Sequence, residues 1–216
     1  MIIITTQCFL PEIGGIESLM SGLAESLCEL GNDVLVLADG KEDIENDIHT
    51  KYAIKRFHGW KPIRRIKKAL YLESICSKKK VDIIFADSWK STEYLRKKNK
   101  KILVLAHGTE IPKQYWTLMI DGLRFKKNRI INSYKNVYKI IANSNYTKDL
   151  MLASLNISNK KIEIIHPGID VYREFISNSE KEFVQKIIYK RRPVITTLAQ
   201  IEKRKGHKFI IKAIYE

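Results

Sequence analysis

Short, continuously apolar runs alternate with longer amphipathic segments, and this alternation most limits what the 216-residue chain can fold into. Runs of this length without polar alternation are typical of strands that are buried on both faces of a sheet. The pattern therefore predicts the α/β class, with a Rossmann-like, doubly wound parallel sheet between two layers of helices. The expected strands are Ile2 to Thr5, Val34 to Ala38, Tyr52 to Phe57, Val81 to Ala86, Ile102 to Ala106, Tyr138 to Ala142 and Ile162 to Ile165.

Helical periodicity fills the segments between these strands. From Ile16 to Leu30 apolar residues recur at the i, i+3, i+4, i+7 spacing of a helix with one buried face, and Gly31 predicts a left-handed C-terminal cap. The other expected helices run from about Ile63 to Ser77, near Thr92 to Lys98, from about Lys113 to Lys135 and from Thr147 to Leu155.

The character of the sequence changes near residue 170. We expect residues 1–170 to form one domain and residues 171–192 to form a charged, helical connector. Pro193 then introduces an expected strand from Val194 to Leu198, a turn that ends at Gly206, and a last helix. Residues 193–216 therefore predict the first βα unit of an incomplete second domain, because one strand and one helix cannot bury a core of their own.

Composition restricts the partners and the cellular setting. With 39 Lys and Arg against 24 Asp and Glu, the net charge is +15, which favours nucleic acid, an anionic membrane surface or a phosphorylated substrate. The three cysteines form no CxxC pair and no cluster with histidine, so we expect neither a zinc site nor a disulfide framework, and a cytoplasmic location fits. We expect no signal peptide and no membrane span, since no run approaches the roughly 18 apolar residues that a span needs.

Basic residues gather in clusters that have aromatic and apolar neighbours. The largest cluster runs from Lys61 to Lys68, between Trp60 and Tyr71. Basic amphipathic helices of this kind dock onto anionic lipid headgroups, although a plain solvated lysine-rich surface explains the same pattern. No nucleic-acid partner is expected, because the sequence has no RNP-like aromatic strand, KH loop or zinc knuckle.

Polar residues directly follow four of the expected strands. These residues are Gly14 with Gly15, Asp87, His107 and Ser144. Ligands of open parallel sheets bind outside the carboxyl ends of the strands, so the pattern predicts a cleft at that edge. The paired glycines either leave backbone N–H groups bare for a phosphate or another anion, or only relieve crowding in a tight turn.

Three residues near this edge have both a structural and a functional interpretation. His107 ends an apolar strand beside a glycine, which places its imidazole at the floor of the cleft, yet a lone histidine is more often structural. Glu110 fits a carboxylate at a helix start, and Ser144 fits a helix cap as well as a ligand contact. No metal is expected, since there is no Asp-x-Asp motif or acidic cluster suited to Mg²⁺ or Mn²⁺.

Five motifs, taken in order, resemble those of the family 4 glycosyltransferases, which have the GT-B fold. They are the Phe9-x-Pro11-x-x-Gly14-Gly15-x-Glu17 loop, His107 to Glu110, Ala142 to Lys148, Ile164 to Asp170 and Arg204 to His207. The resemblance extends over nearly the whole chain. It implies transfer of a sugar, with retention of configuration, from a nucleotide-sugar donor to a glycan or lipid-linked acceptor. It also implies that this chain holds the N-terminal, acceptor-binding domain and the beginning of the donor-binding domain.

The same resemblance implies roles for individual residues. His107 would lie beside the transferred sugar, and Gly14 and Gly15 would line the active cleft. Glu17, Asp87 and Ser144 would contribute to the cleft or to acceptor binding. Lys205, together with Arg204, would hold the diphosphate of the donor.

One position departs from the family pattern. The arginine that family members carry five residues before the lysine is Gln200 here, and a neutral amide cannot supply a charged fork, which puts the donor affinity or donor type in question. No cofactor is expected, because cationic side chains and helix dipoles stabilise the leaving diphosphate in this fold. A nucleotide-sugar epimerase of the same fold, or a basic membrane- or nucleic-acid-binding module without catalysis, remains the alternative.

Overall fold

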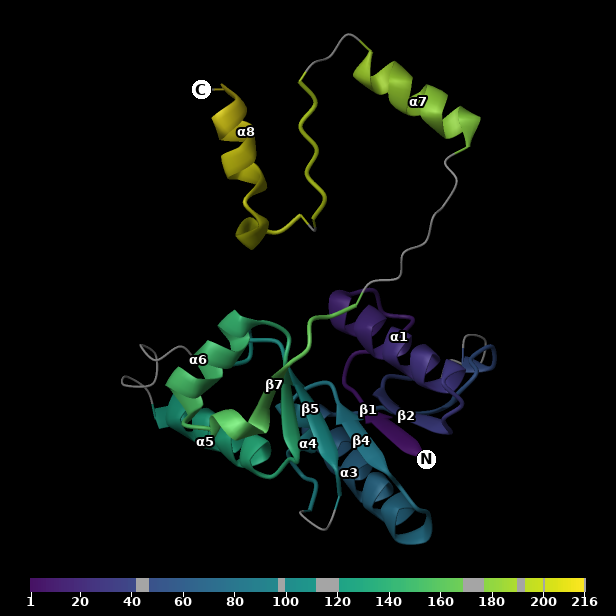
Figure 1. The fold of residues 1–216 in the computed structure, drawn as a ribbon, viewed down its shortest axis with the longest axis vertical. Helices are drawn as coiled ribbons and strands as arrows, with labels where there is room; N and C mark the ends of the chain where they lie inside the picture. Colours follow the sequence, from purple (N-terminus) through teal and green to yellow (C-terminus); the bar gives the residue numbers. More distant parts are fainter. Residues whose placement is uncertain are drawn as a thin grey trace. The chain divides into compact units, whose positions relative to one another are not determined.

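The computed structural model describes residues 1–41, 47–96, 100–111, 121–168, 177–189, 193–199 and 201–215; for 121–124 and 204 it describes the backbone alone. Residue contacts divide the chain into two units, Met1–Ile169 and Asp170–Glu216. Unit 1 holds the sheet and the helices around it, and each unit is described by itself (Figure 1).

Unit 1 is built on a seven-stranded sheet with the order β3-β2-β1-β4-β5-β6-β7. Every pair of neighbouring strands is parallel, which confirms the predicted doubly wound sheet. The chain order reverses between β1 and β4, and at such a switch point the crevice for a ligand opens at the carboxyl ends of the strands. The strands are β1 Ile2–Thr5, β2 Val34–Asp39, β3 Ala53–Phe57, β4 Ile83–Ala86, β5 Ile102–Ala106, β6 Lys139–Ala142 and β7 Ile162–Ile164.

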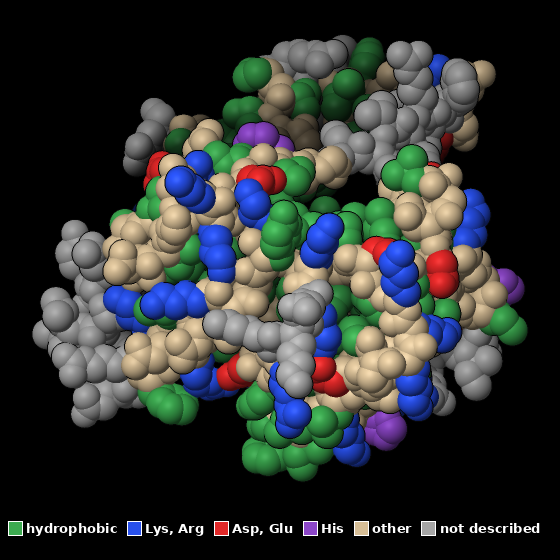
Figure 2. Space-filling model, turned by 60° about the horizontal axis from the view of Figure 1, so that its bottom comes forward, with side chains coloured by type: hydrophobic (Ala, Val, Ile, Leu, Met, Phe, Trp, Pro, Cys, Tyr) green, Lys and Arg blue, Asp and Glu red, His purple; other side chains and the backbone are tan. Residues whose placement is uncertain are grey.

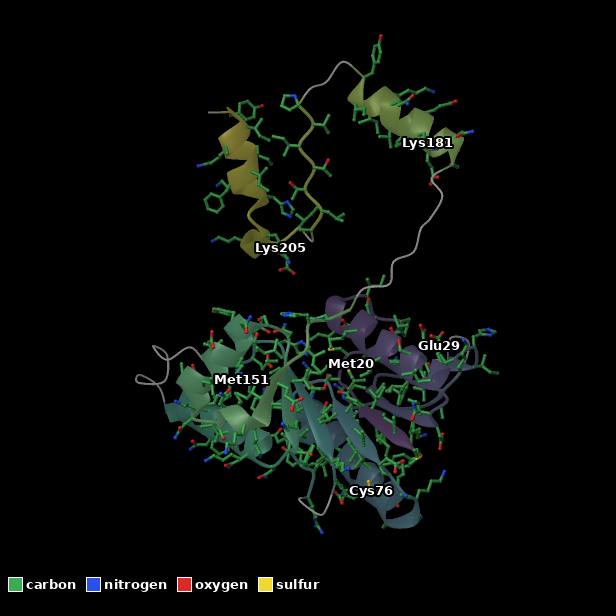
Figure 3. All side chains as sticks on the ribbon, viewed as in Figure 1. Met20, Glu29, Cys76, Met151, Lys181 and Lys205 are labelled. Atoms are coloured by element: carbon green, nitrogen blue, oxygen red, sulfur yellow. The ribbon has the colours of Figure 1, made fainter. Side chains whose placement is uncertain are left out.

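Helices cover both faces of this sheet. Successive strand residues point to opposite faces, so Ile3 and Ile4 belong to two different apolar clusters. Met20 points from α1 into the cluster of Ile4, whereas Met151 belongs to the cluster of Ile3 (Figure 3). The α-helices that the structure describes in unit 1 are α1 Gly15–Glu29, α3 Lys61–Lys78, α4 Trp89–Thr92, α5 Asp121–Lys135 and α6 Asn145–Leu155, and a 3-10 turn covers Asn159–Lys161.

The end of α1 confirms the predicted cap. Gly31 has a φ of +79°, and its backbone N–H donates to the carbonyl of Cys28. A left-handed residue of this kind turns the chain out of the helix and satisfies a free carbonyl of the last turn.

The short helix α4 was predicted at the wrong place. It spans Trp89–Thr92 instead of residues near Thr92 to Lys98. The Trp89 side chain is buried in the core, so the turn that carries it packs against the sheet directly after β4. Of the expected long helix from Lys113, residues 113–120 lie outside the described residues, and α5 is described from Asp121.

Unit 2 contains helices α7 Asn178–Ile188 and α8 His207–Tyr215, with the 3-10 turn Lys203–Lys205 before α8. The expected strand from Val194 to Leu198 is wrong, because the part of unit 2 that the structure describes contains no strand. A strand needs a neighbour for its backbone hydrogen bonds, and apolar, β-branched residues alone do not supply one.

Candidate functional site

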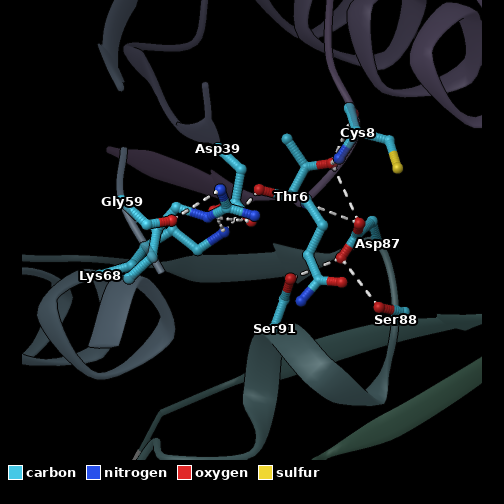
Figure 4. A network of polar contacts seen from close by, with 10 residues as sticks. Thr6, Cys8, Asp39, Gly59, Lys68, Asp87, Ser88 and Ser91 are labelled. Atoms are coloured by element: carbon cyan, nitrogen blue, oxygen red, sulfur yellow. Dashed lines mark hydrogen bonds and ion pairs between the residues drawn. The ribbon is translucent and has the colours of Figure 1, made fainter. Parts of the chain in front are cut away.

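The carboxylate of Asp87 joins the loops after β1 and β4 at the switch point of the sheet (Figure 4). Its Oδ2 accepts from the backbone N–H of Gln7 at 2.7 Å and from Thr6 Oγ1 at 3.1 Å. Its Oδ1 accepts from the hydroxyls of Ser91 at 2.6 Å and Ser88 at 3.2 Å. Because Asp87 is only 2 % exposed and both its oxygens accept hydrogen bonds, it supports the loops at the carboxyl edge of the sheet, which we call the rim, instead of facing a ligand.

A buried lysine holds the same loop from the opposite side. Lys68 reaches from α3 to donate to the carbonyl of Thr6 at 2.5 Å and to Asp39 Oδ1 at 2.8 Å. Arg64 Nε lies 2.9 Å from the second oxygen of Asp39, which completes a buried cluster at the carboxyl ends of β1 and β2. A buried charge is tolerated when it is paired in this way.

Arg56, the fourth residue of β3, fixes the next part of the β1–α1 loop. Its Nη2 donates to the carbonyl of Leu10 at 2.7 Å, while Nε and Nη2 together bind both oxygens of Asp47. The planar guanidinium suits this forked contact. The β1–α1 loop is thus held by Lys68, Arg56 and Asp87.

Sequence reasoning missed Lys68, Arg56 and Asp39 as parts of the site. One signal was available for Lys68, which lies four residues before Leu72, on the face of α3 that enters the core. A lysine at a core-facing helical position needs a buried acidic or carbonyl partner.

His107 lies at the carboxyl end of β5 and contacts the same rim. Its Nε2 lies 2.9 Å from the backbone carbonyl of Asp87, and because a carbonyl only accepts, Nε2 is the donor of this hydrogen bond. Nδ1 is then the nitrogen that can accept a hydrogen bond. Through Asp87, His107 is connected to the loop that leads to Gly14 and Gly15.

The Glu110 carboxylate closes the turn after His107. Its Oε1 accepts from the backbone N–H of His107 at 2.9 Å and from the hydroxyl of Tyr134 at 3.1 Å. Burial, and then the charge of Glu110, raise the pKa of Tyr134 well above its usual range, so this hydroxyl keeps its proton and remains a donor. Glu110 therefore holds the imidazole-bearing turn, and residues 112–120, where the expected helix would begin, lie outside the described residues.

The start of α1 carries a carboxylate of the protein itself. A Cβ placed on Gly14 would lie 2.2 Å from Glu17 Oε2, so only a glycine leaves room for this carboxylate to fold back over the helix start. A Cβ on Gly15 would meet nothing within 4 Å, so the space beside Gly15 is open. An anion at a helix N-terminus is favourable, and Glu17 supplies one at the place where we expected a bound phosphate.

The charge around this end of the rim is locally negative. Burial, followed by the charges of Asp87 and Glu17, raises the pKa of the Cys8 thiol to about 11. Glu12 contributes in the same direction. This acidic surrounding contrasts with the net charge of +15 of the chain.

Gly108, in the turn after β5, lies against Thr147 in the first turn of α6, which follows β6. Gly108 has a φ of +85°, and a Cβ there would lie 2.9 Å from Thr147 Oγ1, so a glycine is required on both grounds. Ser144 Oγ accepts from the backbone N–H of Thr147 at 3.2 Å and is the N-cap of α6. The capping interpretation explains this serine, and no contact beyond the cap is needed.

Two of the predicted residues belong to unit 2. Lys205 is exposed at the end of the turn Lys203–Lys205, and Gly206 follows it with a φ of +77°. The backbone of Arg204 lies in the same turn, whereas its side chain and Gln200 are outside the described residues.

The described part of the chain lacks a metal-binding cluster and a membrane-spanning helix. There, no group of three or more His, Cys, Asp and Glu side chains is arranged to hold a metal ion. No described helix is both long and apolar enough to cross a bilayer. The three cysteines form no disulfide.

Several solved structures have a similar fold, and some of them are named as glycosyltransferases. Anabaena HepE in complex with UDP gives a TM-score of 0.72 at 13% identity, over 99% of this chain and 57% of that one. A glycosyltransferase from Rickettsia africae gives 0.68 at 19% identity, over 99% and 56%. WaaG, a glycosyltransferase involved in lipopolysaccharide biosynthesis, gives 0.59 at 12% identity, over 88% and 52%. At these identities the likeness shows the fold, and the chain spans a little over half the length of these proteins.

No curated protein matches the chain. The family model of Glycosyltransferase Family 4, by contrast, matches residues 13–173, which is well over half of the 216 residues. The match includes the glycines of the β1–α1 loop, Asp87, His107 and Ser144. The chain therefore belongs to glycosyltransferase family 4.

Proposed function

We propose that this protein transfers a sugar from a nucleotide-sugar donor to an acceptor hydroxyl, with retention of configuration at the anomeric carbon. The bond between the sugar and the diphosphate breaks, a bond to the acceptor oxygen forms, and the hydroxyl proton is released. Membership of the family supports this proposal, and the similar HepE was solved both with UDP and with UDP and glucose.

The observation that carries the proposal is the position of His107. Its Nε2 is bound to the Asp87 carbonyl at the switch point, so Nδ1 is available to accept a hydrogen bond from a sugar hydroxyl. In this role His107 orients the sugar, and the open space beside Gly15 admits the ligand close to the backbone. Lys205 and Arg204 would bind the diphosphate, and no metal or other cofactor would be required.

The position of Glu17 indicates which part of the ligand fits at the start of α1. Its carboxylate folds back over Gly14 at the helix start, so a donor phosphate at this helix start would have to displace it. A hydroxyl group of the acceptor or of the sugar suits the same place without that displacement, because a carboxylate accepts hydrogen bonds.

The finer parts of the proposal concern the acceptor and the location. We propose a glycan or a lipid-linked acceptor, used in the cytoplasm or at the inner face of a membrane. The unpaired cysteines fit a reducing compartment, and the net charge of +15 fits an anionic surface.

Transfer of labelled glucose from UDP-glucose to a membrane and glycan extract tests the proposal. With the polypeptide purified as the cell makes it, His107→Ala should lower transfer about a hundredfold, since a misplaced sugar loses its reactive geometry. His49→Ala, which changes an exposed histidine, is the matched control. Undiminished transfer by His107→Ala, or release of an epimerised nucleotide sugar in place of a glycoside, would contradict it.

A further inference from the structure

Helix α3 exposes apolar side chains on the face that points away from the sheet. Trp60, which precedes the helix, is 72 % exposed, Ile63 is 48 %, Ile66 is 41 % and Leu70 is 60 %. These positions lie three to four residues apart, so they form one stripe on the helix. We call this stripe, with the exposed Lys61 and Lys67, the docking face.

The inward face of the same helix explains why this stripe needs a partner. Ala69 and Leu72 pack in the core, and Lys68 is buried against Thr6 and Asp39. Ala69, Leu72 and Lys68 thus make the contacts of α3 with the sheet, and the exposed stripe is not needed for them. The docking face takes no part in the core of unit 1.

Uncompensated charge along α3 is positive only. Glu73, the one acidic residue of the helix, is paired with Lys100, and Arg65 is paired with Glu93. Arg64 and Lys68 share Asp39. On α3 and directly after it, the exposed lysines that form no ion pair with any described residue are Lys61, Lys67, Lys78, Lys79 and Lys80.

The space-filling view shows the surface on the side of unit 1 where α3 lies. Lys and Arg side chains are interspersed there with apolar ones, and acidic side chains are less frequent than basic ones (Figure 2). A surface of this composition combines electrostatic attraction to anionic headgroups with burial of apolar side chains.

We propose that the docking face binds an anionic lipid bilayer, with Ile63, Ile66 and Leu70 entering the headgroup boundary and the lysines contacting the headgroups. RNA bases can stack on the ring of Trp60, but RNA would leave Ile63, Ile66 and Leu70 without a gain, because aliphatic side chains offer no ring for stacking. A bilayer interacts with both the aliphatic side chains and the lysines of this surface.

Docking through α3 places the bilayer beside the candidate site. The helix begins after the carboxyl end of β3, and Lys68, two residues from Ile66, holds the Thr6 carbonyl at the rim. This surface deepens the proposed function, since a lipid-linked acceptor held in that bilayer would reach the cleft. The docking itself is measured without any transfer reaction.

Co-sedimentation with vesicles tests the docking face. The full chain is mixed with phosphatidylcholine vesicles that contain or lack phosphatidylglycerol, over a series of salt concentrations. One variant combines Ile66→Ser with Leu70→Ser, and the other combines Lys61→Glu with Lys67→Glu. Matched controls are Leu30→Ser, at a residue that is 78 % exposed beyond α1, and Lys41→Glu.

We expect binding to the anionic vesicles that weakens as salt rises, and little binding to the neutral ones. The lysine variant should bind at least fivefold more weakly, since each lysine near such a surface contributes about a factor of five. The serine variant should lose about tenfold in affinity through its missing apolar contacts, and both controls should bind like the wild type. Thermal unfolding of each variant verifies that the exposed substitutions leave the fold intact.

Three results would overturn the proposal: no binding to anionic vesicles, equal binding by the docking-face variants and the wild type, or tighter binding to a single-stranded oligonucleotide than to vesicles. If vesicle binding fails while sugar transfer persists, the docking face is wrong and the proposed function stands. If vesicle binding is observed while sugar transfer fails, the docking face stands and the proposed function is wrong.

Discussion

Helices α1 and α3 cover opposite faces of the same sheet and use their side chains in opposite ways. α1 directs Met20 and Ala24 into the core and is a conventional amphipathic helix. α3 buries Lys68 at a core-facing position and leaves Ile66 and Leu70 in solvent. Apolar content is therefore not sufficient to tell which side of a helix faces the sheet.

The difference shows what each helix does for the site. α1 is stabilised by apolar burial and presents its N-terminus, with Gly15 and Glu17, to the rim. α3 gives up part of that stabilisation, because a buried ion pair is on balance no more stabilising than well-packed apolar side chains. In return, the Lys68 ammonium fixes a backbone carbonyl of the rim.

The largest effect should come from Lys68→Met, which leaves Asp39 buried with Arg64 alone and removes the donor to Thr6. We expect a loss of about 3–5 kcal/mol in the free energy of unfolding. Urea denaturation measures it, and Lys67→Met, one position away but exposed, should change stability by at most about 0.5 kcal/mol. Equal losses in the free energy of unfolding for Lys67→Met and Lys68→Met would show that the buried contacts of Lys68 do not stabilise the fold.

The next largest effect is a difference in the free energy of unfolding between apolar substitutions on α1 and on α3. Met20→Ala should cost about 2–5 kcal/mol, because it removes a fully buried side chain and leaves a cavity between α1 and the sheet. Leu70→Ala on α3 removes a similar volume from a side chain that is 60 % exposed, so the cost should stay within about 0.5 kcal/mol. The same denaturation experiment decides, and a large loss at Leu70 would mean that its side chain is covered.

The smallest expected effect is a difference in alkylation rate between two thiols, Cys8 and Cys76. Cys8, near α1, is surrounded by carboxylates, which together with burial raise its pKa to about 11. The pKa of Cys76 on α3 is also raised by burial, but Lys100 opposes that shift. Iodoacetamide should therefore alkylate Cys76 faster than Cys8 at mildly alkaline pH, as measured by mass spectrometry of the modified peptides.

The pH dependence of stability follows from the same shift. The folded state holds the Cys8 proton more tightly than the unfolded chain, so this contribution to stability is lost as the pH rises from the ordinary thiol range towards 11. Glu17→Gln removes one of the raising charges, and it should speed alkylation of Cys8 without changing that of Cys76. Faster labelling of Cys8 than of Cys76 in the wild type would contradict the assignment.

Much of the fold was predictable because it depends on periodicity. Strands buried on both faces produce continuous apolar runs, so β1, β2 and β5 were located almost to the residue. The position of His107 at the carboxyl edge followed from the same pattern. Each of these features is encoded locally.

The features that sequence reasoning missed depend on contacts between distant residues. Lys68 meets Thr6 across 62 positions of the chain, and no local pattern reveals that partner. The place of α4 was decided by burial of Trp89 against the sheet rather than by helix propensity. The failure at Val194 to Leu198 has the same origin, because the backbone groups of a strand must find a neighbour.

The attachments of the β1–α1 loop determine when it can become ordered during synthesis. Leu10, Thr6 and Gln7 are held by Arg56, Lys68 and Asp87, which leave the ribosome 46, 62 and 80 residues later, respectively. Strand β1 is among the first elements made, yet the loop behind it gains its last support only when β4 has emerged and joined the sheet. The loop nearest the N-terminus thus receives its last attachment only after the fourth strand has been translated.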